Sequence, residues 1–199
     1  MLTDSAHARK FRMPSIPDKY TKPAIILHWL IAALMMVNVI LGLSAESLRD
    51  EWVRPAVDTH KSIGITVLGL AILRLLWRAT HKPPPMPGTY GRLERLGAHA
   101  AHGALYLLMF MLPLSGWMHD SAWKDAATHP MQYFNLFEWP RIGWIMAIEP
   151  VTKERLHDAF GAAHMWIGNV LYVMFALHVL GALKHQFLDR EKELQRMLP

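Results

Sequence analysis

The sequence has 199 residues, of which 52% are hydrophobic, with a net charge of +5 and no cysteine. The absence of cysteine excludes disulfides, thiolate-held iron–sulfur clusters and covalent cofactor attachment through a C-x-x-C-H motif. The hydrophobic residues gather into four long runs, each of about the 20 residues that a membrane helix needs. In a membrane protein, a net positive charge is explained by basic loops on one membrane face. No nucleic-acid partner is therefore expected.

Four membrane helices are predicted in chain order, at about residues 23–43, 60–77, 96–118 and 162–183. Pro23 suits a first helical turn, the stretch "HKPPPMPG" ends the second helix, and Pro113 is expected to kink the third, as membrane helices tolerate. The polar and basic residues 1–22 are not typical of a cleavable signal, so the first span is expected to be retained. Together the runs predict an all-α integral membrane four-helix bundle, with residues 1–199 as a single membrane domain.

Lysine and arginine are distributed unequally between the two ends of the predicted bundle. The two terminal tails and the segment between the second and third helices hold 13 of them, against 6 in the other two connections. By the positive-inside rule, both termini are predicted to be cytoplasmic and residues 119–161 to form a periplasmic loop.

The predicted loop at 119–161 is rich in aromatic side chains, namely Tyr133, Phe134, Phe137, Trp139 and Trp144. This density favours a segment that rests at the lipid headgroups, where aromatic rings gather. A lid over a buried cofactor is the alternative interpretation.

Two histidines of the fourth helix lie on one of its faces. His164 and His178 are 14 positions apart, which at about 100° per residue is about 40° short of four full turns. At a rise of about 1.5 Å per residue, the two side chains are about 21 Å apart along the helix. A single metal ion cannot bind both rings, but two stacked cofactors can.

Two other histidines lie at matching depths. His28 is near the cytoplasmic start of the first helix and His60 is at the outer start of the second, so the topology pairs His28 with His178 and His60 with His164. Two bis-histidine sites at two depths are the arrangement for two non-covalent haem b groups in a four-helix bundle. Zinc is a weaker alternative, because only two histidines meet at each depth and no carboxylate or cysteine is near. A single one of these histidines could be a solvated interfacial residue, but a depth-matched set of four argues against that interpretation.

Three basic residues of the second helix are candidates for pairing with haem propionates: Lys61, Arg74 and Arg78. Lys61 directly follows one ligand candidate, and the two arginines lie at the inner end of the helix. The arginines could equally be basic anchors at the membrane face, so both interpretations stay open.

Three further histidines, His99, His102 and His185, gather at the cytoplasmic end of the predicted bundle. Polar groups that converge on an apolar crevice suit a quinone head group, and histidine can supply protons near neutral pH. These three are therefore the candidates for a quinone site. His157 is a weaker alternative to His164 as an iron ligand, since it lies two helical turns further out.

Glycines in the second and fourth helices have two interpretations of equal weight. They would let a flat macrocycle approach the backbone, or they simply let membrane helices pack closely. The residues concerned are Gly64, Gly69, Gly161 and Gly168.

Four stretches of the sequence resemble, in order, the bacterial cytochrome b561 family of four-helix di-haem membrane proteins. "AIILHWLIA" resembles the ligand motif of that family's first helix, and "THKSIGITVLGLAILRLLWR" resembles its second helix. "AHAAHGALYLLMFMLPLSGW" resembles the third helix, and "FALHVLGALKHQFLDREKELQRMLP" resembles the fourth helix and its tail. The resemblance extends from about residue 20 to the end, and it implies iron ligands at His28, His60, His164 and His178.

The resemblance also implies a function and a location. It implies a multi-pass protein of the bacterial inner membrane that binds two haem b groups and transfers electrons between a periplasmic donor and the quinone pool, with ubiquinone as a substrate. One alternative is a superoxide:ubiquinone oxidoreductase, and another is a membrane-anchor electron-transfer subunit of a separate redox enzyme. A transporter without a cofactor is the third. Residues 119–161 differ from the family's pattern, so the electron donor stays open. A superoxide- or quinone-linked enzyme activity stays open with it.

Overall fold

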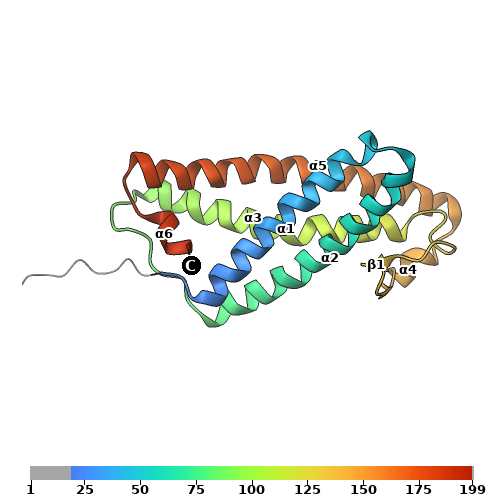
Figure 1. The fold of residues 1–199 in the computed structure, drawn as a ribbon, viewed down its shortest axis with the longest axis horizontal. Helices are drawn as coiled ribbons and strands as arrows, with labels where there is room; N and C mark the ends of the chain where they lie inside the picture. Colours follow the sequence, from blue (N-terminus) through green and yellow to red (C-terminus); the bar gives the residue numbers. More distant parts are fainter. Residues whose placement is uncertain (1–18, 199) are drawn as a thin grey trace, which may run out of the picture.

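The structure is a computed structural model that describes residues 19–198, and it consists mainly of four long helices (Figure 1). These are α1 (Lys22–Ser44), α2 (Asp50–Thr80), α3 (Arg92–Ser121) and α5 (Pro150–Leu183). Each helix is long and apolar enough to cross a membrane. The predicted all-α bundle of four spans is thereby confirmed. Most of the polar and basic N-terminal tail, residues 1–18, lies outside the described residues.

The remaining elements are short and connect or cap the four spans. The 3-10 turn η1 (Ala45–Ser47) joins α1 to α2, and strands β1 (Gln132–Tyr133) and β2 (Phe137–Glu138) form an antiparallel hairpin. α4 (Gly143–Met146) precedes α5, a π-helical turn η2 (Lys184–Leu188) follows it, and α6 (Glu193–Met197) closes the described chain.

Two of the spans begin at least ten residues earlier than the sequence predicted. α2 begins at Asp50 instead of His60, because Asp50 and Glu51 favour a helical first turn and Pro55 falls within the first two turns, where few backbone hydrogen bonds are lost. α5 begins at Pro150 instead of about residue 162, since the Glu149 side chain accepts hydrogen bonds from the backbone N–H groups of Val151 and Thr152. The connection predicted at 119–161 therefore contains only about 28 residues outside the two long helices, Ala122 to Glu149.

The four spans form two antiparallel pairs, α1 with α2 and α3 with α5, as Figure 1 shows. Close backbone packing joins α3 to α5, α1 to α2 and α2 to α3, whereas neither α1 nor α2 packs closely along α5. We call the end of the bundle that carries Lys19 and α6 the terminal end, and the end that carries the hairpin and α4 the loop end. A small apolar core of Ile31, Ile63, Val67, Ala71 and Met109 holds α1, α2 and α3 together.

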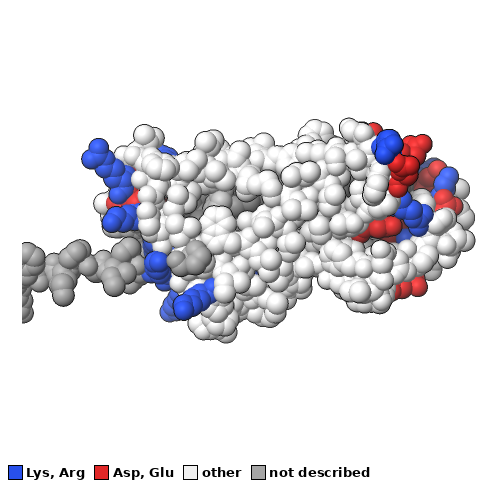
Figure 2. All heavy atoms as spheres, viewed as in Figure 1, with Lys and Arg blue, Asp and Glu red and all other residues white. Residues whose placement is uncertain are grey.

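The outer surface of the bundle matches a bilayer. Figure 2 shows an uncharged belt between two charged ends, with lysine and arginine at the terminal end and both signs of charge at the loop end. Many large apolar side chains on this belt are exposed, among them Ile40, Leu76 and Trp166. Lipid tails would cover this surface, since a soluble protein rarely exposes so much contiguous apolar area.

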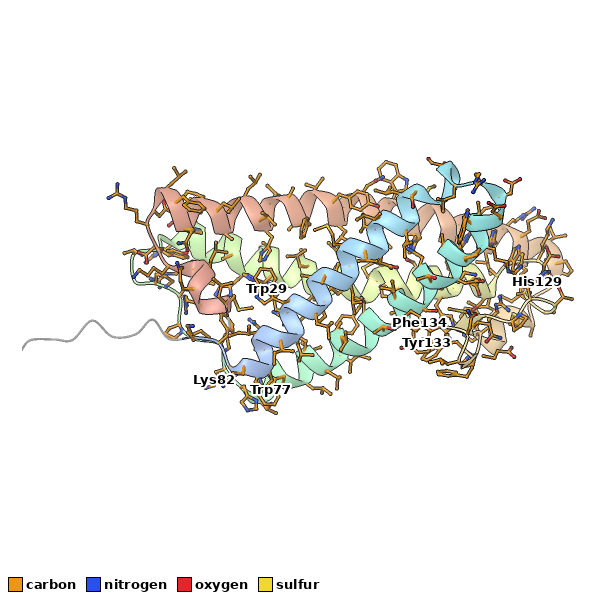
Figure 3. All side chains as sticks on the ribbon, viewed as in Figure 1. Trp29, Trp77, Lys82, His129, Tyr133 and Phe134 are labelled. Atoms are coloured by element: carbon orange, nitrogen blue, oxygen red, sulfur yellow. The ribbon has the colours of Figure 1, made fainter. Side chains whose placement is uncertain are left out.

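At the loop end, the hairpin lies against α2 (Figure 3). Ser62 is 1% exposed, and its hydroxyl accepts a hydrogen bond from the Phe134 N–H at 3.0 Å and donates to the Asp58 carbonyl at 2.9 Å. The Tyr133 hydroxyl is 2.9 Å from that of Thr66. These contacts fix the hairpin beside the middle of α2, but its tip leaves Phe134 and Leu136 exposed. The structure therefore places the aromatic segment next to a span and does not make it a free linker.

Candidate functional site

The four histidines singled out by depth form two facing ring pairs. His28 of α1 and His178 of α5 have ring centroids 6.3 Å apart at the terminal end. His60 of α2 and His164 of α5 have ring centroids 6.1 Å apart toward the loop end. α5 supplies one ring to each pair. This agrees with the prediction that His164 and His178 lie on the same face of the fourth helix.

The spacing within each pair fits one metal ion held from both sides. A metal-bound imidazole nitrogen lies about 2 Å from the ion and about 1.1 Å from its own ring centre, so two rings facing each other across one ion have centroids about 6.2 Å apart. The observed separations of 6.3 and 6.1 Å agree with this value. The pairs also bridge α5 to α1 and to α2, the helices that do not pack closely along it. The residues present therefore fit bis-histidine haem at both ends.

The His60 ring is oriented by the backbone of α1. Its Nδ1 lies 2.9 Å from the Asn38 carbonyl oxygen, so this nitrogen carries the proton and donates it. A Cβ placed on Gly42 would be only 3.1 Å from Cε1 of His60, which means that the ring reaches the helix backbone only because residue 42 is a glycine. With Nδ1 occupied, Nε2 is the nitrogen that could bind a metal ion.

The His164 ring is oriented in the same way by α3. Its Nδ1 lies 3.1 Å from the Leu112 carbonyl oxygen and 3.0 Å from the Ser115 hydroxyl. A Cβ on Gly116 would be 3.1 Å from Cε1 of His164. In both cases the accepting carbonyl lies four residues before the glycine, one helical turn away. Sequence reasoning missed Gly42 and Gly116, although a glycine at the depth of a ligand histidine is a signal that could have identified them.

The pair at the terminal end has a third histidine beside it. The His102 ring centroid is 5.3 Å from that of His178, and Nδ1 of His102 donates to the Ala98 carbonyl at 2.6 Å. Of the three quinone candidates, His102 alone lies next to a ligand pair. His99 is exposed, and His185 stacks on Tyr90 with ring centroids 4.4 Å apart.

His185 belongs to a polar cluster where the tail returns to the bundle. Lys184 Nζ donates to Asp189 Oδ2 at 2.6 Å and to Glu94 Oε1 at 3.1 Å, and His185 Nδ1 is 2.7 Å from Asp189. The hydrogen bond from Lys184 holds the pKa of Asp189 below its usual range, while burial raises the pKa of Tyr90. The lysine ammonium lies between the two carboxylates. We therefore interpret this cluster as an ion-pair network and not as a metal site.

The three propionate candidates have different surroundings. Lys61 is ion-paired with Asp120 at 2.7 Å, and Asp120 also pairs with Arg141 at 2.8 Å. Arg74 donates to the Tyr106 hydroxyl at 3.0 Å and to the Ala24 carbonyl at 3.2 Å. Arg74 and Arg78 both lie over the Tyr106 ring, and neither pairs with a carboxylate among the described residues.

A third histidine pair, His119 and His157, lies further toward the loop end and is built differently. The two rings stack with centroids 3.9 Å apart and planes inclined by 19°. Each Nδ1 bonds to the backbone carbonyl of the other residue, at 2.8 and 3.0 Å. No metal ion fits between stacked rings at this spacing, so His157 is not placed as a substitute for His164. Gly161, suggested as a macrocycle contact, instead lies beneath the His119 ring.

Comparison with known proteins identifies the family. The family model for prokaryotic cytochrome b561 matches residues 19–199. Cytochrome b561 homolog 2 of Escherichia coli is 35% identical over 92% of each chain. Two further relatives are a probable superoxide oxidase CybB of Yersinia pestis, 28% identical over 91% of this chain and 96% of its own, and a cytochrome b562 of Cereibacter sphaeroides, 26% identical over 90% and 94%. The chain therefore belongs to the prokaryotic cytochrome b561 family, bacterial membrane proteins that bind haem b and transfer electrons.

Proposed function

We propose that this chain binds two haem b groups and carries electrons across the bacterial inner membrane, between a periplasmic donor and ubiquinone. The observation that supports the proposal most directly is the pair of facing histidine rings at each end, with centroids 6.3 and 6.1 Å apart and one partner of each on α5. The two sites are separated by about 21 Å along that helix, against a hydrocarbon core of about 30 Å. Together the two sites span most of the thickness of the hydrocarbon core.

The chain's own residues bind the cofactors, orient their ligands and exclude water. The bound haems supply the one-electron chemistry. The Asn38 and Leu112 carbonyls hold His60 and His164 through Nδ1, which fixes the tautomer and raises the basicity of the ligand nitrogen. The apolar helices around the rings keep water away from both sites.

Arg74 is the best placed of the propionate candidates. It lies at the terminal end near His28, its guanidinium is fixed by Tyr106 and Ala24, and it has no carboxylate partner among the described residues. Arg78 is one turn further out on the same helix. Lys61 remains a candidate for the other site, where it would have to share its charge with Asp120.

The quinone site is proposed at the terminal end, beside His102, with the terminal end facing the cytoplasm. His102 is in contact with His178, so a quinone head group there would be adjacent to the terminal-end haem. The variant His102→Ala should slow quinone reduction while both haems stay bound, whereas the exposed His99→Ala is the matched control on the same helix. An unchanged rate in His102→Ala would place the quinone elsewhere.

Removal of single ligands tests the two-haem arrangement. His28→Ala and His178→Ala should remove the same component of the reduced-minus-oxidised spectrum, with the double variant no worse than either, because loss of one axial ligand already opens the site. His60→Ala and His164→Ala should remove the other component. A pyridine-haemochrome ratio of one haem per chain in the unmodified protein, or a match between His28→Ala and His164→Ala, would contradict the proposal.

Superoxide oxidation is the second candidate function, favoured by the similarity to the probable superoxide oxidase of Yersinia pestis over 91% of this chain. In that reaction superoxide gives one electron to the protein and leaves as dioxygen. Rapid reduction of the purified, oxidised haems by superoxide, abolished by superoxide dismutase, is the expected result. Reduction that depends instead on a co-purifying soluble protein would favour a membrane-anchor subunit.

A further inference from the structure

A cavity of about 350 Å³ opens at the terminal end, between the start of α1, the end of α2 and α3. Tyr20 and Thr21 form one side of it, Trp77 and Arg78 the other, and Tyr106 lies at its inner wall. Trp77 Nε1 donates to the Thr21 hydroxyl at 2.8 Å, which ties the two sides together. Figure 3 shows Trp77 and Lys82 close to each other at this corner of the bundle.

The cavity is lined by positive charge only. Lys19, Arg74, Arg78 and Lys82 all border it, and its lining contains no aspartate or glutamate. None of the four forms an ion pair with any residue that the structure describes, although other cations of the chain, such as Lys61 and Arg141, do. Four cations around one small space repel one another, so an anion bound there would be strongly favoured.

The aromatic wall fixes two of these cations in place. The guanidinium carbons of Arg74 and Arg78 lie 5.8 and 5.7 Å from the Tyr106 ring centroid. Arg74 uses two of its five N–H donors on Tyr106 and Ala24. The donors that remain are therefore held in position before a ligand arrives, which reduces the entropy cost of binding.

The cavity lies at the membrane–water border, and this position favours a lipid headgroup as the anion. Tyr20 and Trp77 mark the membrane–water border, where such rings concentrate. Towards the membrane centre, the outer faces of α1 and α2 expose Ile26, Leu73 and Leu76, at 63, 55 and 59% of their full area. A lipid whose phosphate lies in the cavity would thus have its acyl chains beside the apolar, lipid-exposed surfaces of these two helices, as in basic lipid-headgroup pockets between membrane helices.

We propose that this cavity binds the phosphate headgroup of an anionic phospholipid from the leaflet at the terminal end. Arg78, Lys82 and Lys19 contact the phosphate, and Trp77 and Tyr20 lie at the glycerol level. Because Arg74 and Arg78 border the cavity and are also propionate candidates, the terminal-end haem has to be followed together with the lipid.

The experiment uses the purified haem-loaded protein, delipidated in a neutral detergent and titrated with phosphatidylglycerol. Native mass spectrometry should retain one phosphatidylglycerol per chain, and the thermal midpoint should rise with that lipid but not with phosphatidylethanolamine. The double variant Arg78→Gln/Lys82→Gln should bind phosphatidylglycerol about 30-fold more weakly, which converts to about 2 kcal/mol, or about 1 kcal/mol for each cation lost. The control Lys153→Gln/Arg155→Gln removes the same charges at the loop end and should bind as the unmodified protein does.

Three outcomes would overturn the proposal. Equal affinity for phosphatidylglycerol and phosphatidylethanolamine would show that the headgroup charge does not determine binding. Full competition by equimolar inorganic phosphate would show that the cavity binds phosphate and not a lipid. Loss of the terminal-end haem from Arg78→Gln/Lys82→Gln, seen in the optical spectrum, would assign these cations to the haem propionates. The single variant Lys82→Gln, furthest from His28, gives a second measure of lipid affinity if the double variant does not fold.

Discussion

At the scale of single residues, the ligand histidines toward the loop end depend on what lies behind each ring. His60 and His164 donate from Nδ1 to a carbonyl on another helix, and each ring lies on a glycine one turn further along that helix. The glycine removes a side chain that would otherwise hold the ring away from the backbone. The positions of these two rings therefore depend on Gly42 and Gly116, which are not themselves among the proposed iron ligands.

Replacement of these glycines should disturb the loop-end site selectively. In Gly42→Ala or Gly116→Ala, the new methyl group would be 3.1 Å from the ring, so the ring must move and its Nδ1 hydrogen bond lengthens. We expect about a tenfold or greater loss of haem affinity at the loop-end site, together with a shifted redox potential, and an unchanged terminal-end spectrum. Gly69→Ala and Gly103→Ala are the controls, because a Cβ there meets nothing within 4 Å. Equal effects from all four variants would indicate a general helix effect.

The relative orientation of the two rings in each pair makes a spectroscopic prediction. The imidazole planes are inclined by 70° in the His28–His178 pair and by 78° in the His60–His164 pair. Nearly perpendicular imidazoles leave the iron orbitals almost degenerate, so both oxidised haems should give highly anisotropic low-spin signals in electron paramagnetic resonance. Ordinary rhombic signals, typical of parallel imidazole planes, would show that the rings turn when haem binds.

At the scale of elements, one buried carboxylate joins the loop-end segment to two of the spans. Asp120 of α3 is 6% exposed and pairs with Lys61 of α2 and with Arg141 in the connection before α5. Arg141 also donates to the His129 carbonyl at 2.7 Å and to the Ala126 carbonyl. A charge cluster thus helps to position the connection that carries the hairpin and α4, together with buried apolar side chains such as Ile145 and Met131.

Neutralising this carboxylate should destabilise the protein strongly. Asp120→Asn leaves Arg141, whose side chain is 8% exposed, without a carboxylate partner among the described residues, and leaves Lys61 only its longer pair with Asp58 at 3.5 Å. Breaking a buried ion pair in this way typically costs about 3–5 kcal/mol, and the thermal midpoint in detergent should fall accordingly. The double variant Asp120→Asn/Arg141→Gln should lose less than the sum of its single changes, because one stranded cation is removed. Asp189→Asn, at an exposed ion pair, is the control and should change the midpoint little. Additive losses would mean that the two residues are not coupled.

The sequence predicted the elements that depend on local pattern and missed those that depend on tertiary contact. The depth of the four histidines follows from helical rise, so both ring pairs could be predicted from spacing. The early start of α5 was missed because its first residues are polar and the signal used was hydrophobicity, although Glu149 and Pro150 form a capping pattern that could have identified the start. The pairing of Lys61 with Asp120 joins residues of two different helices, which no local pattern reveals.

At the scale of the whole molecule, the uneven charge distribution orients the bundle. The terminal end carries an excess of lysine and arginine, and the loop end carries both signs (Figure 2). Anionic lipids and the insertion machinery favour basic segments on the cytoplasmic side. The terminal end, with its histidine pair and lipid cavity, is therefore expected to face the cytoplasm.

Reporter fusions test this orientation. A fluorescent protein that folds only in the cytoplasm should be active when fused after residue 199, and alkaline phosphatase at the same position should be inactive. The reverse should hold for fusions in the connection at residues 127–128, which are exposed. Phosphatase activity at the C-terminus would exchange the two sides, and with them the proposed donor and quinone ends.

The shared use of α5 has a consequence for the assembly of the protein during synthesis. Ribosomes produce α1 and α2 first, so His28 and His60 enter the membrane well before either partner ring exists. Both partners, His164 and His178, lie on the last of the four spans. In the proposed two-haem arrangement, neither site can be completed until that span has been translated and inserted, so haem binding would be a late step that requires all four spans. A ribosome that stalls before α5 leaves a product with no complete haem site, not one with half the normal complement.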